Sequence, residues 1–191
     1  AMVTAFQAQG STLSGLDDAA ANINSGQATV AQANTVSAVT SGTTTATISD
    51  GDMSTLAGIT GTGNAYTISV TDGTVDATEL NALDAKTTVA VGVTSGTITG
   101  DVADVKIAYA AQGSTISGLG KENVTLNDSS IAATDINSVN GSTDGTVTVS
   151  ATTITGDVSD VKLAYAAQGS GVDGLGNENV TFKLPKELRV G

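Results

Sequence analysis

One stretch of sequence occurs twice in this chain, with its two copies 56 residues apart. Residues 97–126 and residues 153–182 are identical at 23 of 30 positions. The main differences are conservative, as where Ile116 is replaced by Val172. Apolar positions that stay apolar indicate that both copies build the same kind of core. The sequence therefore predicts a repeat protein, in which each unit packs against its neighbours.

Traces of the same unit reach the N-terminal end of the chain. Residues 5–16 match residues 108–119, so the chain begins partway through a unit and resembles a piece of a longer array. We expect residues 1–182 to form one repeat array. Its best preserved parts are the 56-residue unit 97–152 and the copy that begins it again, 153–191. Residues 183–191 hold the only proline, and we expect them to be a cap or the start of the next segment.

Short β-like segments alternate with helical ones along the chain. Alternating apolar and β-branched residues predict strands centred near residues 23, 46, 68, 91, 125, 147 and 181. Asp101 and Asp157 are predicted to cap the N-termini of two helices, which Gly113 and Gly169 would end. The strand spacing predicts a short coil of 22 residues that alternates with a long coil of 34. The long coil would carry a glycine-rich loop at residues 114–120, with Ile116 and Leu119 turned inward.

Each passage from one strand to the next is too long for a hairpin and suits a crossover between parallel strands. The predicted fold is therefore α/β: a right-handed parallel α/β solenoid of about seven coils. Its strands would form one sheet, with short helices on the other side. The alternative is a β-solenoid, in which the helical segments are only turns.

Composition excludes several classes of function. The net charge is −12, from 19 acidic and 7 basic residues, and this disfavours nucleic acid as a partner because phosphate contacts require clustered Lys and Arg. The chain has no Cys and no His, which removes disulfides, the usual zinc ligands and the commonest catalytic groups. No run of 18 apolar residues is present, so we expect no membrane insertion. We expect no enzymatic activity, no catalytic residue and no cofactor.

The acidic residues recur in register with the repeat, at strand ends and helix starts. This placement indicates helix capping and Asx turns. The alternative is a calcium site, for which the candidate ligands are Asp50, Asp52 and Asp128, in two short turns rich in oxygen ligands. Neither turn has the spacing of an EF-hand loop.

A stripe of hydroxyl side chains is the candidate ligand face. Stacked coils would align outward-facing residues of the strands into a flat row, as in the ice-binding solenoids. Threonine is also an ordinary surface residue of strands, and Ala90 and Gly92 interrupt the row. The residues of this candidate face are Thr47, Thr67, Ser69, Thr125, Thr148 and Thr181.

Three segments resemble a known repeat type: residues 97–113 (TITGDVADVKIAYAAQG), 118–126 (GLGKENVTL) and 79–86 (ELNALDAK). They are similar to units of the form LNxLD…TLTGxxADVxxAYAxxGIxGLGNExVTL. Such units recur in very large surface or secreted proteins of cyanobacteria and other marine bacteria. The resemblance is good over residues 65–182 and loose over 1–64. It implies a repeat segment of an extracellular or cell-surface, adhesin-like protein.

From the repeat and this resemblance we expect a structural or adhesive segment that acts as an elongated, acidic spacer. Its partners would be the neighbouring repeats of the same chain, together with surface glycans or cell-envelope components. The alternative is a binding module that presents one face of the solenoid to ice, to a glycan or to a partner bridged by Ca²⁺.

Overall fold

The computed structural model describes residue 15 and residues 17–183 and divides the chain into two compact units. The first unit consists of residues 1–73, 79–94 and 111–118, and the second of residues 74–78, 95–110 and 119–191. Residues 1–14, residue 16 and residues 184–191 lie outside the described part. The match at residues 5–16 and the expected cap at 183–191 therefore fall almost entirely outside it.

The first unit contains two three-stranded sheets, with the orders β1-β2-β3 and β4-β6-β8. Helices α2 and α3 lie in it, together with most of α4. Its elements are β1 (Ala21–Ala28), α2 (Val30–Ser37), β2 (Thr44–Ile48), α3 (Met53–Leu56), β3 (Ala65–Thr67), β4 (Ser69–Val70), α4 (Ala77–Asp84), β6 (Val91–Val93) and β8 (Ile116–Ser117).

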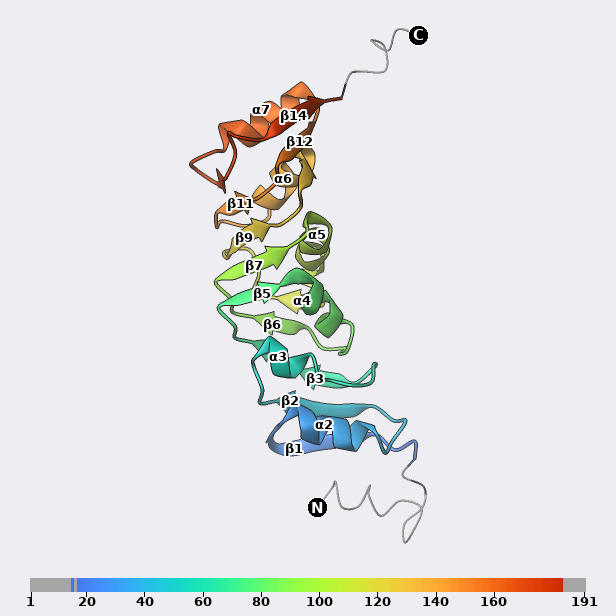
Figure 1. Ribbon diagram of the computed structural model, residues 1–191. Coiled ribbons are helices and arrows are strands. Elements are labelled where there is room, and N and C mark those ends of the chain that lie inside the picture. The colour runs from blue at the N-terminus through green and yellow to red at the C-terminus, as the bar shows by residue number, and fades with distance from the viewer. Residues whose placement is uncertain (1–14, 16, 184–191) are drawn as a thin grey trace, which may run out of the picture. The chain divides into compact units, whose positions relative to one another are not determined.

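The second unit contains a five-stranded sheet, β13-β11-β9-β7-β5, and a three-stranded sheet, β10-β12-β14. Neighbouring strands β5, β7, β9 and β11 can be followed in Figure 1. Its elements are β5 (Thr74–Asp76), β7 (Thr97–Gly100), α5 (Val102–Ala111), β9 (Asn123–Leu126), β10 (Ser130–Ala132), α6 (Ala133–Asn140), β11 (Val147–Val149), β12 (Thr153–Gly156), α7 (Val158–Ala166), β13 (Val172–Asp173) and β14 (Asn179–Phe182).

Every strand pair in the described residues is parallel, so the mixed α/β class is confirmed. The prediction that all strands form one sheet was wrong, because there are four sheets. Strands β11 and β12 show why: only residues 150–152 separate them, yet they belong to different sheets. The chain therefore makes two short strands where the sequence pattern indicated one.

The predicted alternation of 22- and 34-residue coils was also wrong. Strand β8 lies within the expected glycine-rich loop, and its Ile116 pairs with Val91, 25 residues earlier. The predicted spacing of 34 residues was measured from β6 to β9, and these two strands belong to different sheets. The inward positions of Ile116 and Leu119 were predicted correctly, since they are 0% and 7% exposed.

The two copies of the repeat fold alike. Strand β7, helix α5, strand β8 and strand β9 of the first copy correspond to β12, α7, β13 and β14 of the second. An offset of 103 residues, the one that relates residues 5–16 to 108–119, also relates α2 (Val30–Ser37) to α6 (Ala133–Asn140). The helix thus stands at an equivalent place in both regions although their sequences differ.

The core consists of thin layers of aliphatic side chains that alternate with exposed residues along the strands. In β2 and β11 the burial alternates strictly between inside and outside. The helices add a buried stripe, as in α6, where Ala133, Ile136 and Val139 face inward. Aliphatic side chains of this size fill most of the interior. Tyr66 is an aromatic exception and is the largest of the fully buried side chains.

At three places a threonine hydroxyl joins two segments of the chain that lie 21 residues apart. Thr40, Thr87 and Thr143 each donate a hydrogen bond to a backbone carbonyl 21 residues earlier, those of Ala19, Tyr66 and Glu122. Each hydroxyl also accepts the backbone N–H of the residue two positions later. We call this arrangement the threonine staple. It satisfies one backbone carbonyl and one backbone N–H that would otherwise lack a hydrogen-bond partner.

Glycine is required beside two of the staples. A Cβ on Gly145 would overlap the backbone of Glu122, and a Cβ on Gly42 would overlap that of Ala19. The Thr-x-Gly sequence at residues 40–42 and 143–145 therefore has a steric reason: the chain passes directly over the carbonyl that the staple binds.

We predict that Thr143→Val lowers the free energy of unfolding by about 1–3 kcal/mol, because it removes the hydroxyl and leaves the Gly145 N–H without its acceptor. Urea unfolding followed by circular dichroism measures the change. The control is Thr148→Val, the same substitution at an exposed strand position, with an expected effect within about 0.5 kcal/mol. Equal effects of the two substitutions would contradict the role of the staple.

Candidate functional site

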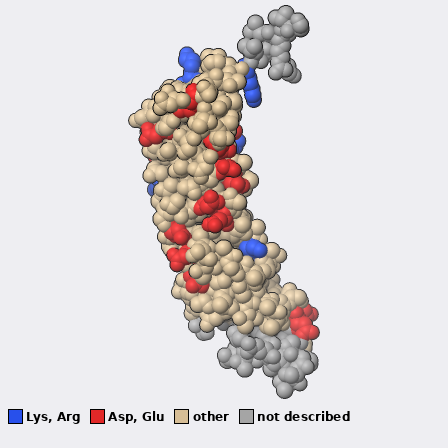
Figure 2. Space-filling view, in the orientation of Figure 1, with Lys and Arg blue, Asp and Glu red and all other residues tan. Residues whose placement is uncertain are grey.

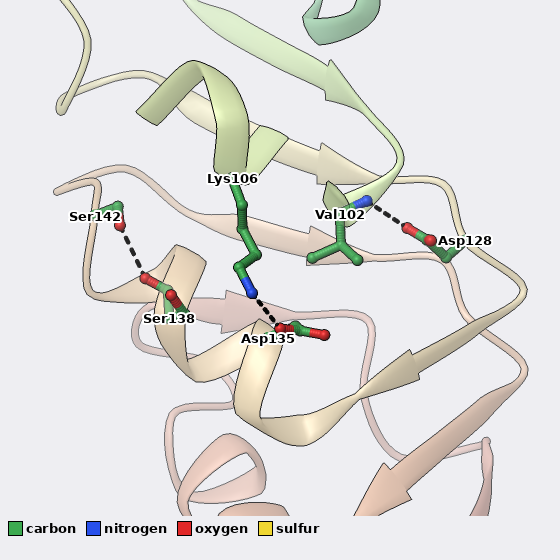
Figure 3. Close-up of polar contacts among 6 residues, drawn as sticks. All are labelled: Val102, Lys106, Asp128, Asp135, Ser138 and Ser142. Atoms are coloured by element: carbon green, nitrogen blue, oxygen red, sulfur yellow. Dashed lines mark hydrogen bonds and ion pairs between the residues drawn. The ribbon is translucent and has the colours of Figure 1, made fainter. Parts of the chain in front are cut away.

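The acidic residues proposed as calcium ligands take part in helix capping. The Asp50 carboxylate accepts the N–H of Val30 at 2.6 Å, and the Asp128 carboxylate accepts the N–H of Val102 at 2.7 Å (Figure 3). Asp72 accepts the N–H of Met53 in the same way, at 2.8 Å. Val30, Met53 and Val102 are each the first residue of a helix, and the aspartate comes from 19 to 26 residues later. Each carboxylate thus meets the positive end of the preceding helix.

This capping by an aspartate 19 to 26 residues later differs from the expected capping by the aspartate directly before the helix. Asp157 stands at the N-cap of α7 as predicted, but its side chain makes no capping hydrogen bond. The third calcium candidate, Asp52, is exposed, stands at the N-cap of α3 and likewise makes none. Within the described residues no three acidic side chains lie close enough together to hold a metal ion. Asp50 and Asp52 lie in the first unit and Asp128 in the second.

The candidate ligand face is distributed over four sheets. Thr47 and Thr67 are aligned neighbours on β2 and β3. Thr125 and Thr148 are aligned on β9 and β11. Ser69 stands opposite Gly92 in a third sheet, and Thr181 stands opposite Thr155 in a fourth. The structure thus brings together two pairs of the predicted residues and leaves the other two apart.

The five-stranded sheet carries a longer row than the sequence indicated. Thr99 on β7 is aligned with Thr125, which extends the pair to Thr99, Thr125 and Thr148 on three consecutive strands. Asp76 and Asp173 flank this row, on β5 and β13. Neighbouring strands are about 4.8 Å apart, so the hydroxyls repeat at about that spacing. We call these five residues the threonine row.

Helices α5 and α6 enclose a shallow groove of about 270 Å³ in the second unit. The Lys106 ammonium of α5 crosses to the Asp135 carboxylate of α6, at 2.6 Å (Figure 3). The Ser142 hydroxyl donates to the carbonyl of Ser138. The one charged side chain that lines the groove, Lys106, is thus paired with a carboxylate. The residues that line it are Lys106, Tyr109, Ala110, Ser138, Val139 and Ser142.

A tyrosine–glutamate pair occurs in both copies of the repeat. The Tyr109 hydroxyl donates to the Glu122 carboxylate, which also accepts the backbone N–H groups of Gly120 and Lys121. The Tyr165 hydroxyl donates to Glu178 at 2.5 Å, and Gly176 again supplies an N–H. Glu122 is only 5% exposed, so its carboxylate depends on these donors.

Burial, and then the contact with the carboxylate, keep both phenols protonated. They raise the pKa of Tyr165 to about 12 and raise the pKa of Tyr109 further. Burial acts to raise the pKa of Glu178 as well, but the hydrogen bonds from Tyr165 and the backbone outweigh it, and the pKa is lowered. A phenol held in its neutral form is a hydrogen-bond donor rather than a base. The pair therefore ties the helix to the loop that follows it and offers no proton transfer at neutral pH.

No protein-family model, no curated protein and no solved structure matches this chain. Among the described residues, no helix combines the length and the apolar character needed to cross a lipid bilayer. Sequence reasoning missed Lys106, Glu122 and Glu178 as site residues. Their one available signal was that the copies keep Lys, Tyr and Glu at equivalent places, as in Lys106 and Lys162.

We predict that Asp128→Ala lowers the free energy of unfolding by about 1 kcal/mol, since it removes the acceptor at the start of α5. Asp52→Ala, at the exposed position that makes no capping bond, is expected to change it by less than about 0.5 kcal/mol. Both values come from urea unfolding in the presence of a chelator. If removal of calcium destabilises the unsubstituted chain as much as Asp128→Ala does, the aspartate is a metal ligand rather than a cap.

Proposed function

We propose that the repeats of this chain stack as a right-handed parallel α/β solenoid of about seven coils. We further propose that it serves as a structural, adhesive spacer segment of a large extracellular bacterial surface protein. The observation that carries this proposal is the recurrence of bonds between neighbouring segments of the chain that lie about one strand-to-strand step apart. Parallel strand pairing, the threonine staple and the aspartate caps all connect residues 19 to 26 positions apart, and they recur in both units.

A unit whose main polar contacts go to its neighbours gains stability from stacking rather than from its own interior. Such a design can be lengthened without change to its core, which suits a part whose task is to bridge a distance. The resemblance to surface-protein repeats over residues 65–182 supports the same proposal, and with it an extracellular or cell-surface location.

The surface supports a structural rather than a catalytic task. Figure 2 shows acidic side chains scattered over the visible face, with few basic ones between them. The net charge of −12 makes such a surface repel nucleic acid and anionic membranes and remain soluble. We propose that the chain is no enzyme, and that its partners are neighbouring repeats together with glycans or other components of the cell envelope.

Tandem duplication tests the stacking. Insertion of one, two or three further copies of residues 97–152 after residue 152 adds two strand steps per copy. We expect the maximum dimension from small-angle scattering to grow by a constant increment of about 10 Å per copy. A 56-residue unit that folded as a separate bead would add about 25 Å, and a compact sphere would grow far less with each copy. Either result would contradict the solenoid.

A second candidate function, a binding module, is favoured by the threonine row and the polar groove between α5 and α6. The row is the surface that could meet ice or a Ca²⁺-bridged partner, and the groove suits a glycan hydroxyl group.

A ligand that binds only the folded chain raises its melting temperature. For a binding module we expect such a shift with Ca²⁺ or with a panel of neutral glycans, or inhibition of ice recrystallisation at micromolar protein. Thr125→Glu would remove an effect at the row, and Lys106→Ala an effect at the groove. Both side chains are at least partly exposed, so the substitutions leave the core intact. For a pure spacer, the unsubstituted chain shows no shift and no inhibition.

A further inference from the structure

Strand β14 exposes two apolar side chains that its copy in the same chain buries. In β9, Val124 and Leu126 are fully buried. The equivalent residues of β14, Val180 and Phe182, are 37% and 49% exposed. The sequences of the two strands, NVTL and NVTF, are nearly the same, so the difference comes from their surroundings.

The difference lies in the number of strand partners. Strand β9 pairs with β7 on one edge and with β11 on the other. Strand β14 pairs with β12 on one edge, and no described strand lies on its other edge. At other edge strands the inward residues are buried even so, as with Val75 of β5, Ile131 of β10 and Val172 of β13. Exposure of the inward face thus singles out β14 among these edges.

Strand β1 is the complementary edge. It pairs with β2 alone among the described strands, and its residues Ala21, Asn22 and Ile23 alternate in the same way as those of β14. Ala21 is buried, Asn22 is exposed, and Ile23 is half-buried against the small cluster of Ala21 and Val36. Apolar residues on the inward side of both edges would extend one core across a junction.

We propose that the outer edge of β14 binds the outer edge of β1 of a second copy of this chain, as a parallel strand pair. The pairing of β9 with β11 supplies the register: Val124 aligns with Val147, Thr125 with Thr148, and Leu126 with Val149. By the same register Val180 aligns with Ala21, Thr181 with Asn22, and Phe182 with Ile23. The junction forms backbone hydrogen bonds and covers both exposed apolar side chains of β14.

Such a contact joins two different surfaces and does not close on itself. A dimer formed in this way uses one β14 edge and one β1 edge and still presents one free edge of each kind, so further copies add to it. Ala21, which stands opposite Val180, has a small side chain. The inward side of the junction therefore has more room for the larger side chain of Phe182. The proposal does not depend on the proposed spacer function, since it concerns two strand edges of the described chain.

Because the chain has no cysteine, a disulfide between two introduced cysteines reports the register directly. A Thr181→Cys variant and an Asn22→Cys variant are mixed with oxidised and reduced glutathione. We expect the mixed disulfide dimer to dominate over both homodimers, because the two aligned side chains leave the sheet on the same face. The control mixture pairs Thr181→Cys with Ile23→Cys, whose side chains would point to opposite faces, and it should cross-link at least tenfold less.

Sedimentation velocity over a range of concentrations tests whether the exposed apolar side chains of β14 form the contact. We expect Phe182→Lys to abolish the concentration-dependent association of the unsubstituted chain. The matched control, Leu163→Lys, introduces the same charge at an apolar position of α7 that is 60% exposed, and it should associate normally. Circular dichroism of both variants verifies that each one folds.

Four outcomes would overturn the proposal. The unsubstituted chain could remain a monomer at all concentrations. Thr181→Cys could prefer its own homodimer, which would indicate antiparallel pairing of two β14 edges. Leu163→Lys could abolish association, which would place the contact on the helix face. Association could appear only after removal of residues 184–191, which would show that these residues themselves occupy the edge.

Discussion

Bonds between segments of the chain that lie 19 to 26 residues apart are the constraint on which the rest of the structure depends. A strand of three or four residues cannot satisfy its own backbone, and a helix of eight residues leaves its first N–H groups without internal acceptors. Here a segment 19 to 26 residues away supplies the missing hydrogen-bond partners: a parallel strand, a threonine hydroxyl or an aspartate carboxylate. Aliphatic side chains fill most of the interior between these elements.

The features that could be predicted from the sequence are those that depend on local pattern and on internal comparison. The alternation in residues 146–149 placed a strand correctly, and Gly113 and Gly169, both with positive φ, follow helices α5 and α7 as expected. The second strand of each repeat was missed because Thr97–Gly100 has only four residues and leads directly into a helix. Its β-branched residues favour a strand, but a segment this short is a strand only because a partner lies beside it.

The site residues divide in the same way. Exposed threonines on strands could be identified from alternation, but their alignment into one row required the register, which brought in Thr99 and set Thr181 in another sheet. The aspartates could be assigned to capping but not to the right helix, because Asp128 serves a helix that begins 26 residues earlier. The only signal for Glu122 was that both copies keep Tyr and Glu at equivalent places, and burial of its carboxylate could not be foreseen because Tyr109 and two backbone N–H groups of the fold stabilise it.

Exposed strand edges arise differently in a repeat protein and in an ordinary domain. In an ordinary domain an exposed strand edge is blunted by charges or proline, because any matching chain can bind it. In a repeat, the same short sequence occurs with two pairing partners in one place and with one in another, as in β9 and in β14, beside whose outer edge no described strand lies. The inward face of β14 carries no charge among Val180 and Phe182, and the first charged residue after it is Lys183. The apolar side chains that fill the interior at β9 are therefore of the same kind as those that β14 exposes, and in these two strands burial accompanies two strand partners and exposure accompanies one.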